Sequence, residues 1–469
     1  MTSKLETGYL LNDQVKFSTL SGDFNPVHTE FKYAKRSMWG GVVVHGIHQV
    51  LSVIELFISR KNIRFFLSKI HVEFLIPLIV DTRTHVVFKE DQKNVVASIV
   101  STDGVTYTDI NFLYEEAPSN YKFVKNVKNG VYKNSLPKEL SIDQVSISEN
   151  SINLVLNYKL LQELFPNIVN NFPYSQIAII LSSTQIVGMH CPGKDSIFSK
   201  LDMYFEGYKN INLKKIDYKV KKIHSFFKLV DTVGYGDGFK YTIRSFFRPK
   251  SQRQMHIKGL SDLVKSNQFL GSKVLVIGGS RGIGEVASKL LAIGGAEVTI
   301  TYFTGDEDAK KIVNNLKKYG YVANCMQFNV LDNVEIEEKF THLYYFASPK
   351  IFTGNKDIFS EELFESFSSH YLVKFAQIVQ CLYSNGLKRV FYPSSTAIDE
   401  LINGMWEYSS VKIAGEHLCD LLENRYKDLK IYKPRFPRIA TDQTLTVMPV
   451  ESIPPESVLV KFITEFHNL

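Results

Sequence analysis

The side chains best suited to proton transfer lie near the N-terminus. Asp23 and His28 are five positions apart, on either side of Asn25-Pro26. Pro26 has no amide hydrogen and biases the residue before it away from helix, so we expect a turn here rather than a regular helix. In a turn, this carboxylate and imidazole can converge on one water molecule. The pair therefore predicts acid-base chemistry.

A second reactive group lies in the C-terminal part of the chain. Ser395 ends an apolar run at residues 390–395, and Tyr408 and Lys412 follow it at i and i+4. On a helix, these two residues share a face. A phenol beside a ketone can donate the proton that hydride addition requires, and a neighbouring ammonium group would lower the pKa of the phenol. The group predicts reduction of a carbonyl.

A glycine-rich turn precedes this group and indicates a nucleotide site. Residues 273–277 are an apolar run suited to a buried parallel strand, and Gly278 to Gly284 follow it. A helical pattern at residues 285–293 and a second strand pattern at residues 297–302 come next. Such a turn brings backbone amides to a pyrophosphate at a helix N-terminus. We therefore expect a Rossmann-like α/β domain with a doubly wound parallel sheet over residues 270–469.

A repeat divides the first half of the chain. The pattern of residues 67–74 recurs at residues 198–205, an offset of 131. Each copy follows an apolar helical stretch, at residues 50–58 and 177–187, and opens an alternating strand pattern. The repeat predicts one helix wrapped by a sheet, made twice, over residues 1–118 and 130–250. Polar linkers separate these domains from each other and from the third domain.

The N-terminal segment resembles a known family. Its matching residues are Phe17, Leu20, Ser21, Gly22, Asp23, Asn25, Pro26, His28, His45 and Gly46. They fit the pattern F-x-x-L-S-G-D-x-N-P-x-H, followed by His-Gly, of the MaoC-like (R)-specific enoyl-CoA hydratases, which have the hot-dog fold. The resemblance implies that Asp23 and His28 are catalytic and that the amide of Gly46 binds the thioester oxygen. It also implies an α+β double hot-dog for the repeat.

The second copy of the repeat lacks the Asp-x-x-x-x-His pair. We expect it to be a degenerate half that completes the sheet and shapes an acyl tunnel. His190 and Cys191 resemble a thiol-histidine pair. Because adjacent residues rarely face each other, a thioesterase role is disfavoured.

The C-terminal residues resemble the short-chain dehydrogenase/reductase family. Its pattern is G-x-x-x-G-x-G, then a serine, then Y-x-x-x-K. The resemblance implies that Ser395, Tyr408 and Lys412 are catalytic. The implied cofactor contacts are Gly278, Ser280, Arg281, Gly282, Ile283, Gly284, Asn329, Tyr408 and Lys412.

This second resemblance has departures. Residues 345–348 replace the usual N-N-A-G, and Arg438 replaces a glycine after the sixth strand. The additional active-site asparagine has no match near His370 or Tyr371, which puts a proton relay through it in doubt. Only 28 residues follow Thr441, which predicts a reduced lid over the substrate.

The residue at the end of the second strand bears on cofactor choice. Tyr302 stands where an acidic side chain would bind the ribose of NAD. Arg281 could pair with a 2′-phosphate because a guanidinium group suits phosphate geometry. Three nearby acidic residues weaken the case for a bound 2′-phosphate: Asp306, Glu307 and Asp308. We expect NADPH in preference to NAD.

The composition excludes several classes of protein. The 469 residues carry a net charge of +7, but the lysines are dispersed, which favours a solvated surface over nucleic-acid binding. No apolar run is long enough for a membrane span, and we see no secretion signal. The four cysteines are scattered without metal-ligand spacing, so we expect no metal and a cytoplasmic location. A basic surface could also attract an anionic acyl carrier.

Together these patterns predict a bifunctional enzyme. A 3-oxoacyl-thioester reductase would form the (R)-3-hydroxyacyl thioester that the N-terminal dehydratase then dehydrates. Such steps belong to fatty-acid or polyketide-like chain processing, on acyl carrier protein or coenzyme A, and a homodimer is compatible with them. The alternatives are a reductase with a non-catalytic hot-dog pair that grips the carrier, a β-oxidation hydratase/dehydrogenase, and a sugar- or secondary-metabolite reductase with an oligomerisation module.

Overall fold

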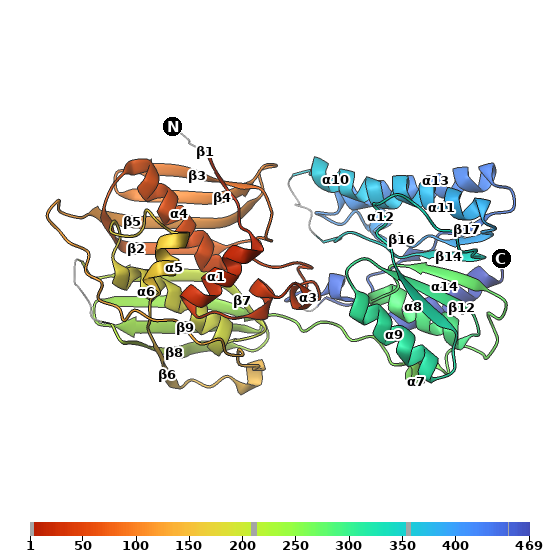
Figure 1. Ribbon diagram of the computed structural model, residues 1–469, viewed down its shortest axis with the longest axis horizontal. Coiled ribbons are helices and arrows are strands. Elements are labelled where there is room, and N and C mark those ends of the chain that lie inside the picture. The colour runs from red at the N-terminus through yellow and green to blue at the C-terminus, as the bar shows by residue number, and fades with distance from the viewer. Residues whose placement is uncertain (1–3, 208–212, 353–357, 449) are drawn as a thin grey trace. The chain divides into compact units, whose positions relative to one another are not determined.

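The computed structural model describes residues 4–207, 213–352, 358–448 and 450–469. It consists of two compact units, Met1–Lys250 with Thr446–Pro449, and Ser251–Leu445 with Val450–Leu469. Each unit has its own large sheet (Figure 1). The first two predicted domains thus lie within one unit, and the change to β-α-β patterning occurs where the second unit begins.

The first unit contains one antiparallel sheet that is ten strands wide within the described residues. Its spatial order is β1-β3-β4-β5-β2-β7-β10-β9-β8-β6. The strands are β1 Lys4–Thr7, β2 Phe65–Phe74, β3 Thr84–Asp91, β4 Asn94–Ser101, β5 Thr106–Glu116, β6 Glu149–Asn153, β7 Ser196–Phe205, β8 Lys215–His224, β9 Leu229–Gly236 and β10 Phe239–Phe247.

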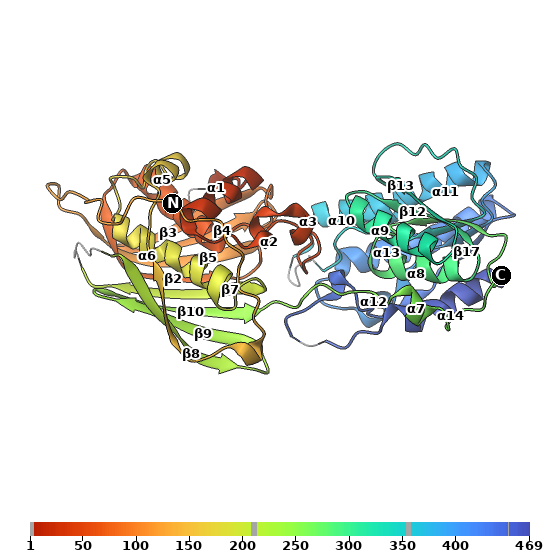
Figure 2. The ribbon, with the colours of Figure 1, turned by 60° about the horizontal axis from the view of Figure 1, so that its bottom comes forward.

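The helices of this unit cover one face of the sheet (Figure 2). The two long central helices, α4 and α6, confirm the helical patterns expected at residues 50–58 and 177–187. A five-residue π-helical turn, η2, continues α6. The elements are α1 Leu11–Ser21, α2 Pro26–Thr29, α3 Phe31–Ala34, α4 Gly46–Lys61, η1 Ile142–Gln144, α5 Tyr158–Leu164, α6 Tyr174–Gln185 and η2 Ile186–His190.

The two repeated strands pair with each other at the centre of the sheet. β2 and β7 are antiparallel, with His71 opposite Asp202 and Val72 opposite Leu201. His71 and Asp202 are equivalent positions of the repeat, because 202 minus 71 equals the offset of 131. A local two-fold axis therefore passes between them, where His71 Nδ1 lies 2.7 Å from Asp202 Oδ1.

Helix α6 also satisfies the backbone of the first half. Strand β2 pairs with β7 from Lys69 to Glu73, and Leu67 lies beyond that stretch. The side chain of Gln176 accepts a hydrogen bond from the Leu67 N–H at 2.9 Å and donates one to its C=O at 2.8 Å. One continuous hydrophobic core underlies both halves, including Phe57 and Phe65 from the first and Ile177 from the second.

The second unit has a parallel sheet with the order β13-β12-β11-β14-β15-β17. The chain starts at the middle strand and extends outward on both sides, which is the doubly wound arrangement that the sequence predicts. The main strands are β11 Lys273–Ile277, β12 Glu297–Tyr302, β13 Ala323–Gln327, β14 His342–Tyr345, β15 Arg389–Phe391 and β17 Lys430–Tyr432. The short strands β16 Ser394–Ser395 and β18 Arg435–Phe436 pair separately.

Helices cover both faces of this parallel sheet. Residues of α8, α9 and α14 fill one core, and residues of α11 and α13 fill another. Buried parallel strands require such cover on both sides. The elements are α7 Ile257–Leu260, α8 Gly282–Ile293, α9 Asp306–Lys318, α10 Glu361–Ser368, the π-helical η3 Ser369–Lys374, α11 Phe375–Ser384, α12 Ala397–Glu400, α13 Trp406–Arg425, η4 Asp442–Thr444 and α14 Pro455–His467.

Replacing Gln176 by leucine tests how much this helix-to-strand contact stabilises the first unit. Two buried peptide groups of Leu67 would lose their partners, so we expect the free energy of unfolding to fall by about 2–6 kcal/mol. Fluorescence of Trp39, in a Trp406→Phe background, would follow urea unfolding of this unit. The same substitution at exposed Gln162 should leave the midpoint unchanged. Equal midpoints for the two variants would contradict the expectation.

Candidate functional site

The segment that carries Asp23 is a turn between two helices. α1 ends at Ser21, and Gly22 closes it in the left-handed conformation with φ of 76°. Asn25 caps α2 because its side chain accepts a hydrogen bond from the N–H of Val27, and Pro26 is the first residue of that helix. The predicted turn is therefore present over residues 22–25, and one helical turn follows it.

Asp23 is almost fully buried, with 1% of its surface exposed. One carboxylate oxygen, Oδ1, accepts a hydrogen bond from the N–H of Asn25 at 3.2 Å, and Oδ2 accepts one from Thr184 Oγ1 at 2.6 Å. Burial raises the pKa of the Asp23 carboxyl, while His28 and the hydrogen bond from Thr184 lower it in part. Such a group is poised to exchange a proton rather than to stay permanently charged.

His28 lies on α2 and faces the same space. Its Nδ1 is 2.7 Å from the carbonyl oxygen of Val43, which can only accept, so Nδ1 carries the proton and Nε2 keeps its lone pair in the neutral ring. Burial lowers the pKa of His28, and the positive charge of Arg248 contributes to this. His28 is thus prepared to act as a base through Nε2.

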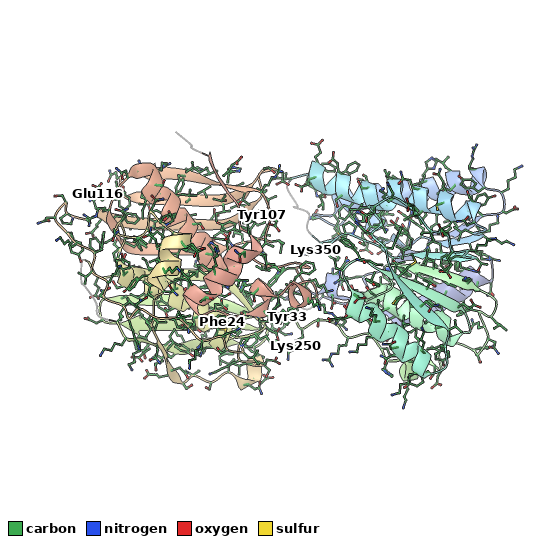
Figure 3. The ribbon with its side chains drawn as sticks, viewed as in Figure 1. Phe24, Tyr33, Tyr107, Glu116, Lys250 and Lys350 are labelled. Carbon is green, nitrogen blue, oxygen red and sulfur yellow. The ribbon has the colours of Figure 1, made fainter. Side chains whose placement is uncertain are left out.

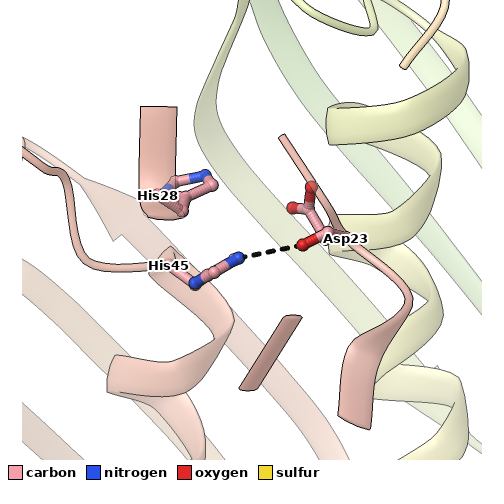
Figure 4. A group of neighbouring side chains, drawn as sticks. All are labelled: Asp23, His28 and His45. Atoms are coloured by element: carbon pink, nitrogen blue, oxygen red, sulfur yellow. Dashed lines mark hydrogen bonds between the residues drawn. The ribbon is translucent and has the colours of Figure 1, made fainter. Parts of the chain in front are cut away.

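His45 completes the cluster, shown with Asp23 and His28 in Figure 4. Its ring stacks on His28 with centroids 3.9 Å apart, and its Nε2 lies 3.2 Å from the carbonyl oxygen of Asp23. Burial lowers the pKa of His45 well below its usual value. Possible ligand atoms of the three residues lie within 4.8 Å of one another.

Gly46 is the first residue of α4, so its amide is among those without an intrahelical acceptor. A side chain here would strike Phe74, since an added Cβ would lie 2.7 Å from its ring. This amide lies at the N-terminus of α4, directly after His45. Its predicted oxyanion role stays a prediction.

The second half contributes to the Asp23 pocket in a way that sequence reasoning missed. Thr184 lies on α6, and Gly188 lies on η2, where an added Cβ would be 2.1 Å from Asp23 Oδ1. These residues are 161 and 165 positions beyond Asp23. A lone threonine and a lone glycine carry no recognisable spacing, so the sequence offers no signal for them.

The His190-Cys191 pair does not form a reactive thiol. Burial raises the pKa of Cys191 to about 11 and lowers the pKa of His190 to about 4. A thiol and a neutral imidazole are therefore present at neutral pH. This agrees with the low expectation for a thioesterase.

The glycine-rich turn has the geometry of a phosphate cradle. Gly278 and Gly282 have positive φ values of 79° and 56°, and a Cβ at Gly284 would lie 2.2 Å from the carbonyl oxygen of Gly278. Arg281 is the N-cap of α8, Ser280 precedes it, and Ile283 is the second residue of the helix. The backbone fits a pyrophosphate at this helix N-terminus, because side chains at the glycines would fill the cradle.

Ser395, Tyr408 and Lys412 come together as predicted. Ser395 forms a hydrogen bond that lowers the pKa of Tyr408 in part, and Lys412 Nζ lies 5.7 Å from the centre of the Tyr408 ring. Lys412 Nζ donates a hydrogen bond to the carbonyl of Pro393 at 2.8 Å and lies 3.7 Å from the centre of the Tyr371 ring.

The prediction that Lys412 lowers the pKa of the Tyr408 phenol is wrong for this structure. Burial raises the pKa of Tyr408 to about 12 and lowers the pKa of Lys412 to about 7. An apolar cluster that includes Phe367 and Tyr371 surrounds the phenol and removes water from both groups. Desolvation of each charged form therefore outweighs the attraction between them.

The remaining cofactor residues lie at the same edge of the parallel sheet. Asn329 follows β13, and its side chain donates to Asp332 and accepts from the N–H of Leu331. Tyr302 ends β12, and a hydrogen bond with Asp306 raises its pKa. Asp306 also pairs with Lys310 at 2.9 Å. The acidic side chain beside Tyr302 is therefore Asp306 of α9, which already pairs with Tyr302 and Lys310.

No helix in the described part of the chain is long and apolar enough to cross a membrane.

The N-terminal part of the chain matches a known family. Residues 5–109 match the family model of the MaoC like domain. Solved short-chain dehydrogenases resemble part of the chain. One from Serratia marcescens is 16% identical, with coverage of 42% of this chain and 91% of that chain and a TM-score of 0.39. One from Burkholderia cenocepacia, in complex with NADP, is 21% identical, with coverage of 42% and 91% and a TM-score of 0.38.

A search of curated proteins found no similar sequence. The family match covers the helices and strands that hold Asp23, His28 and Gly46. In the second unit, Ser395 is on the short strand β16, and Tyr408 and Lys412 are on helix α13. Residues 5–109 therefore form a MaoC-like domain, and a doubly wound α/β unit follows it in the chain.

Proposed function

We propose that the chain is a bifunctional 3-oxoacyl-thioester reductase and (R)-3-hydroxyacyl-thioester dehydratase that uses NADPH and acts on acyl groups carried by acyl carrier protein or coenzyme A. The observation that carries the proposal is the enclosed Asp23-His28 pair, which opposes a raised carboxyl pKa to a lowered imidazole pKa. These shifts bring the pKa values of the two groups closer together. Such a pair can exchange a proton through one water molecule.

In the dehydratase step, Asp23 and His28 divide the proton transfers. His28 Nε2, held by the Val43 carbonyl on the opposite nitrogen, abstracts the proton next to the thioester. The Asp23 carboxyl, whose pKa is raised by burial, gives a proton to the departing hydroxyl, which leaves as water. The amide of Gly46 stabilises the negative charge on the thioester oxygen.

In this proposal the second half of the sheet is a degenerate hot-dog, and residues 1–118, 130–250 and 270–469 are the three domains. The mirrored strand order about β2 and β7 supports this division. The second half lacks its own acid pair and instead covers the Asp23 pocket.

In the reductase, NADPH supplies the hydride. Gly278, Gly282 and Gly284 would cradle its pyrophosphate, with Asn329 at the neighbouring strand end. Tyr408 is a neutral phenol at physiological pH, since its pKa lies near 12, and it donates its proton to the more basic alkoxide that forms from the ketone. Ser395 holds that oxygen, and Lys412 lies beneath the phenol.

The experiment that tests both activities follows acetoacetyl thioesters of coenzyme A and of acyl carrier protein, incubated with NADPH, by mass spectrometry. We expect a mixture of 3-hydroxyacyl and 2-enoyl products. No consumption of either thioester would contradict the proposal. Reduction of simple ketones alone would favour the reductase with an attached oligomerisation module.

Asp23→Asn should stop this reaction sequence at the 3-hydroxyacyl thioester. Loss of a positioned acid or base lowers a rate by about 10²- to 10⁴-fold, so we expect that loss in crotonyl-thioester hydration with reduction intact. Asp143→Asn, at an exposed site, is the matched control. Hydration at the unaltered rate would favour the alternative in which the hot-dog pair only binds the carrier.

Tyr408→Phe should leave the 3-oxoacyl thioester unreduced. The aromatic ring would still fill its place in the apolar cluster, but the proton donor would be gone, so we expect a fall of about 10²- to 10⁴-fold in NADPH oxidation. Hydration of crotonyl thioester should continue. Tyr319→Phe, on the exposed end of α9, should behave as the unaltered protein. Full reduction by the Tyr408 variant would refute this role.

Arg281→Ala tests the preference for NADPH. A guanidinium group that binds the 2′-phosphate contributes roughly 1.5–3 kcal/mol, so the KM for NADPH should rise about 10- to 100-fold. The KM for NADH should change little, because NADH lacks that phosphate. Equal effects on both cofactors would remove Arg281 from this role.

A further inference from the structure

We propose that the second half of the sheet supplies part of the dehydratase site, with Thr184 as a positioning residue that holds the Asp23 carboxylate and Gly188 as the position that leaves room for it. This inference rests on the proposed dehydratase function. It assigns a role to a half of the unit that has no acid-base pair of its own. Figure 4 shows Asp23 on the segment between the two histidines and the helix of the second half.

The hydroxyl of Thr184 makes the shorter of the two hydrogen bonds to Asp23. Its Oγ1 lies 2.6 Å from Oδ2 and donates to it. Thr184 is 3% exposed, so water does not compete for this bond. The bond fixes the rotation of the carboxylate and favours its charged form.

Gly188 defines the space on the other oxygen. An added Cβ would lie 2.1 Å from Oδ1 and 2.5 Å from the carboxyl carbon, far inside van der Waals contact. The residue belongs to the π-helical turn η2, which continues α6 directly after Thr184 and Gln185. Such turns are frequent at functional sites because they re-aim the residues of a helix. Any side chain at position 188 would displace the carboxylate.

The chain on both sides of Asp23 is attached to the same turn. The N–H of Phe24, labelled in Figure 3, donates to Met189 Sδ at 3.1 Å. Asn25 Nδ2 lies 3.3 Å from the carbonyl of Gly188, 3.2 Å from that of Gly193 and 3.0 Å from that of Lys194. The second half therefore holds both the carboxylate and the backbone that carries it.

Other titratable groups face this pocket from neighbouring elements. His28 on α2 and His45, the N-cap residue of α4, lie close to Asp23, and the charge of Arg248 acts on His28. Tyr132, from the segment between the halves, packs on Gly22. Among the influences that favour the charged form of Asp23, the charge of His28 is the largest and the hydrogen bond from Thr184 comes next.

Thr184→Val removes the hydroxyl and keeps the shape of the side chain. Because the lost bond favours the carboxylate, the pKa of Asp23 should rise further, and the pH-dependent step of crotonyl-CoA hydration that reports it should move up by roughly 1–2 pH units. Thr184→Ser restores a donor and should return the step toward its original pH. Ser183→Ala removes a buried hydroxyl that only bonds the Ile180 carbonyl, and it should leave the profile unchanged.

Infrared difference spectra provide a readout that does not require turnover. The carboxylic-acid C=O band that is lost in Asp23→Asn identifies Asp23, and its titration should shift upward in Thr184→Val and not in Ser183→Ala. An unshifted band and pH profile in Thr184→Val would overturn the inference. If the unaltered protein hydrated no thioester while the band still shifted, the proposed function would fail and the Thr184-Asp23 coupling would stand.

Gly188→Ala tests the space beside the carboxylate. We expect hydration to fall at least 100-fold while reduction of the 3-oxoacyl thioester continues, and circular dichroism should verify that the unit is folded. Gly8→Ala is the matched control, since nothing lies within 4 Å of an added Cβ there. A folded Gly188→Ala protein with unaltered hydration and an unaltered Asp23 band would also overturn the inference.

Discussion

The antiparallel pairing of β2 with β7 determines where the rest of the first unit can lie. It places equivalent positions of the repeat, His71 and Asp202, opposite each other, so the two halves are related by a local two-fold axis. That symmetry brings α4 and α6 side by side over one face and lets Gln176 on α6 satisfy the backbone of β2. The end of α6 then meets the turn after α1. A pocket for a buried carboxylate exists only because both halves share this sheet.

Burial of Asp23 is the second constraint, and it follows from the first. A carboxylate without water needs hydrogen-bond donors, and here one donor is the backbone of Asn25 and the other is Thr184 across the two-fold arrangement. The same absence of water lowers the pKa values of His28 and His45 and raises the pKa of Asp23. The second half has no Asp-x-x-x-x-His pair, but its Thr184 and Gly188 line the Asp23 pocket of the first half.

Desolvation also determines the pKa shifts of Tyr408 and Lys412 in the second unit. The parallel sheet brings the glycine turn, Asn329 and Ser395 to one edge, as its topology requires. The phenol of Tyr408 and the amine of Lys412 lie within an aromatic cluster, so burial favours the neutral form of each. Tyr371, on the π-helical η3, lies under Lys412 in the region where the sequence offers no relay asparagine. The neutral phenol remains a competent proton donor to an alkoxide.

The sequence by itself determined the local features of this protein. Pro26 and Gly22 shape the turn around Asp23, the apolar periodicities mark α4, α6 and the strands, and the glycines from Gly278 to Gly284 mark a cradle, since each depends only on nearby backbone geometry. Only the tertiary structure decided that Thr184 and Gly188 touch Asp23, and that burial rather than Lys412 sets the pKa of Tyr408. Contacts between residues over 160 positions apart, and the water they exclude, depend on packing that no local spacing encodes.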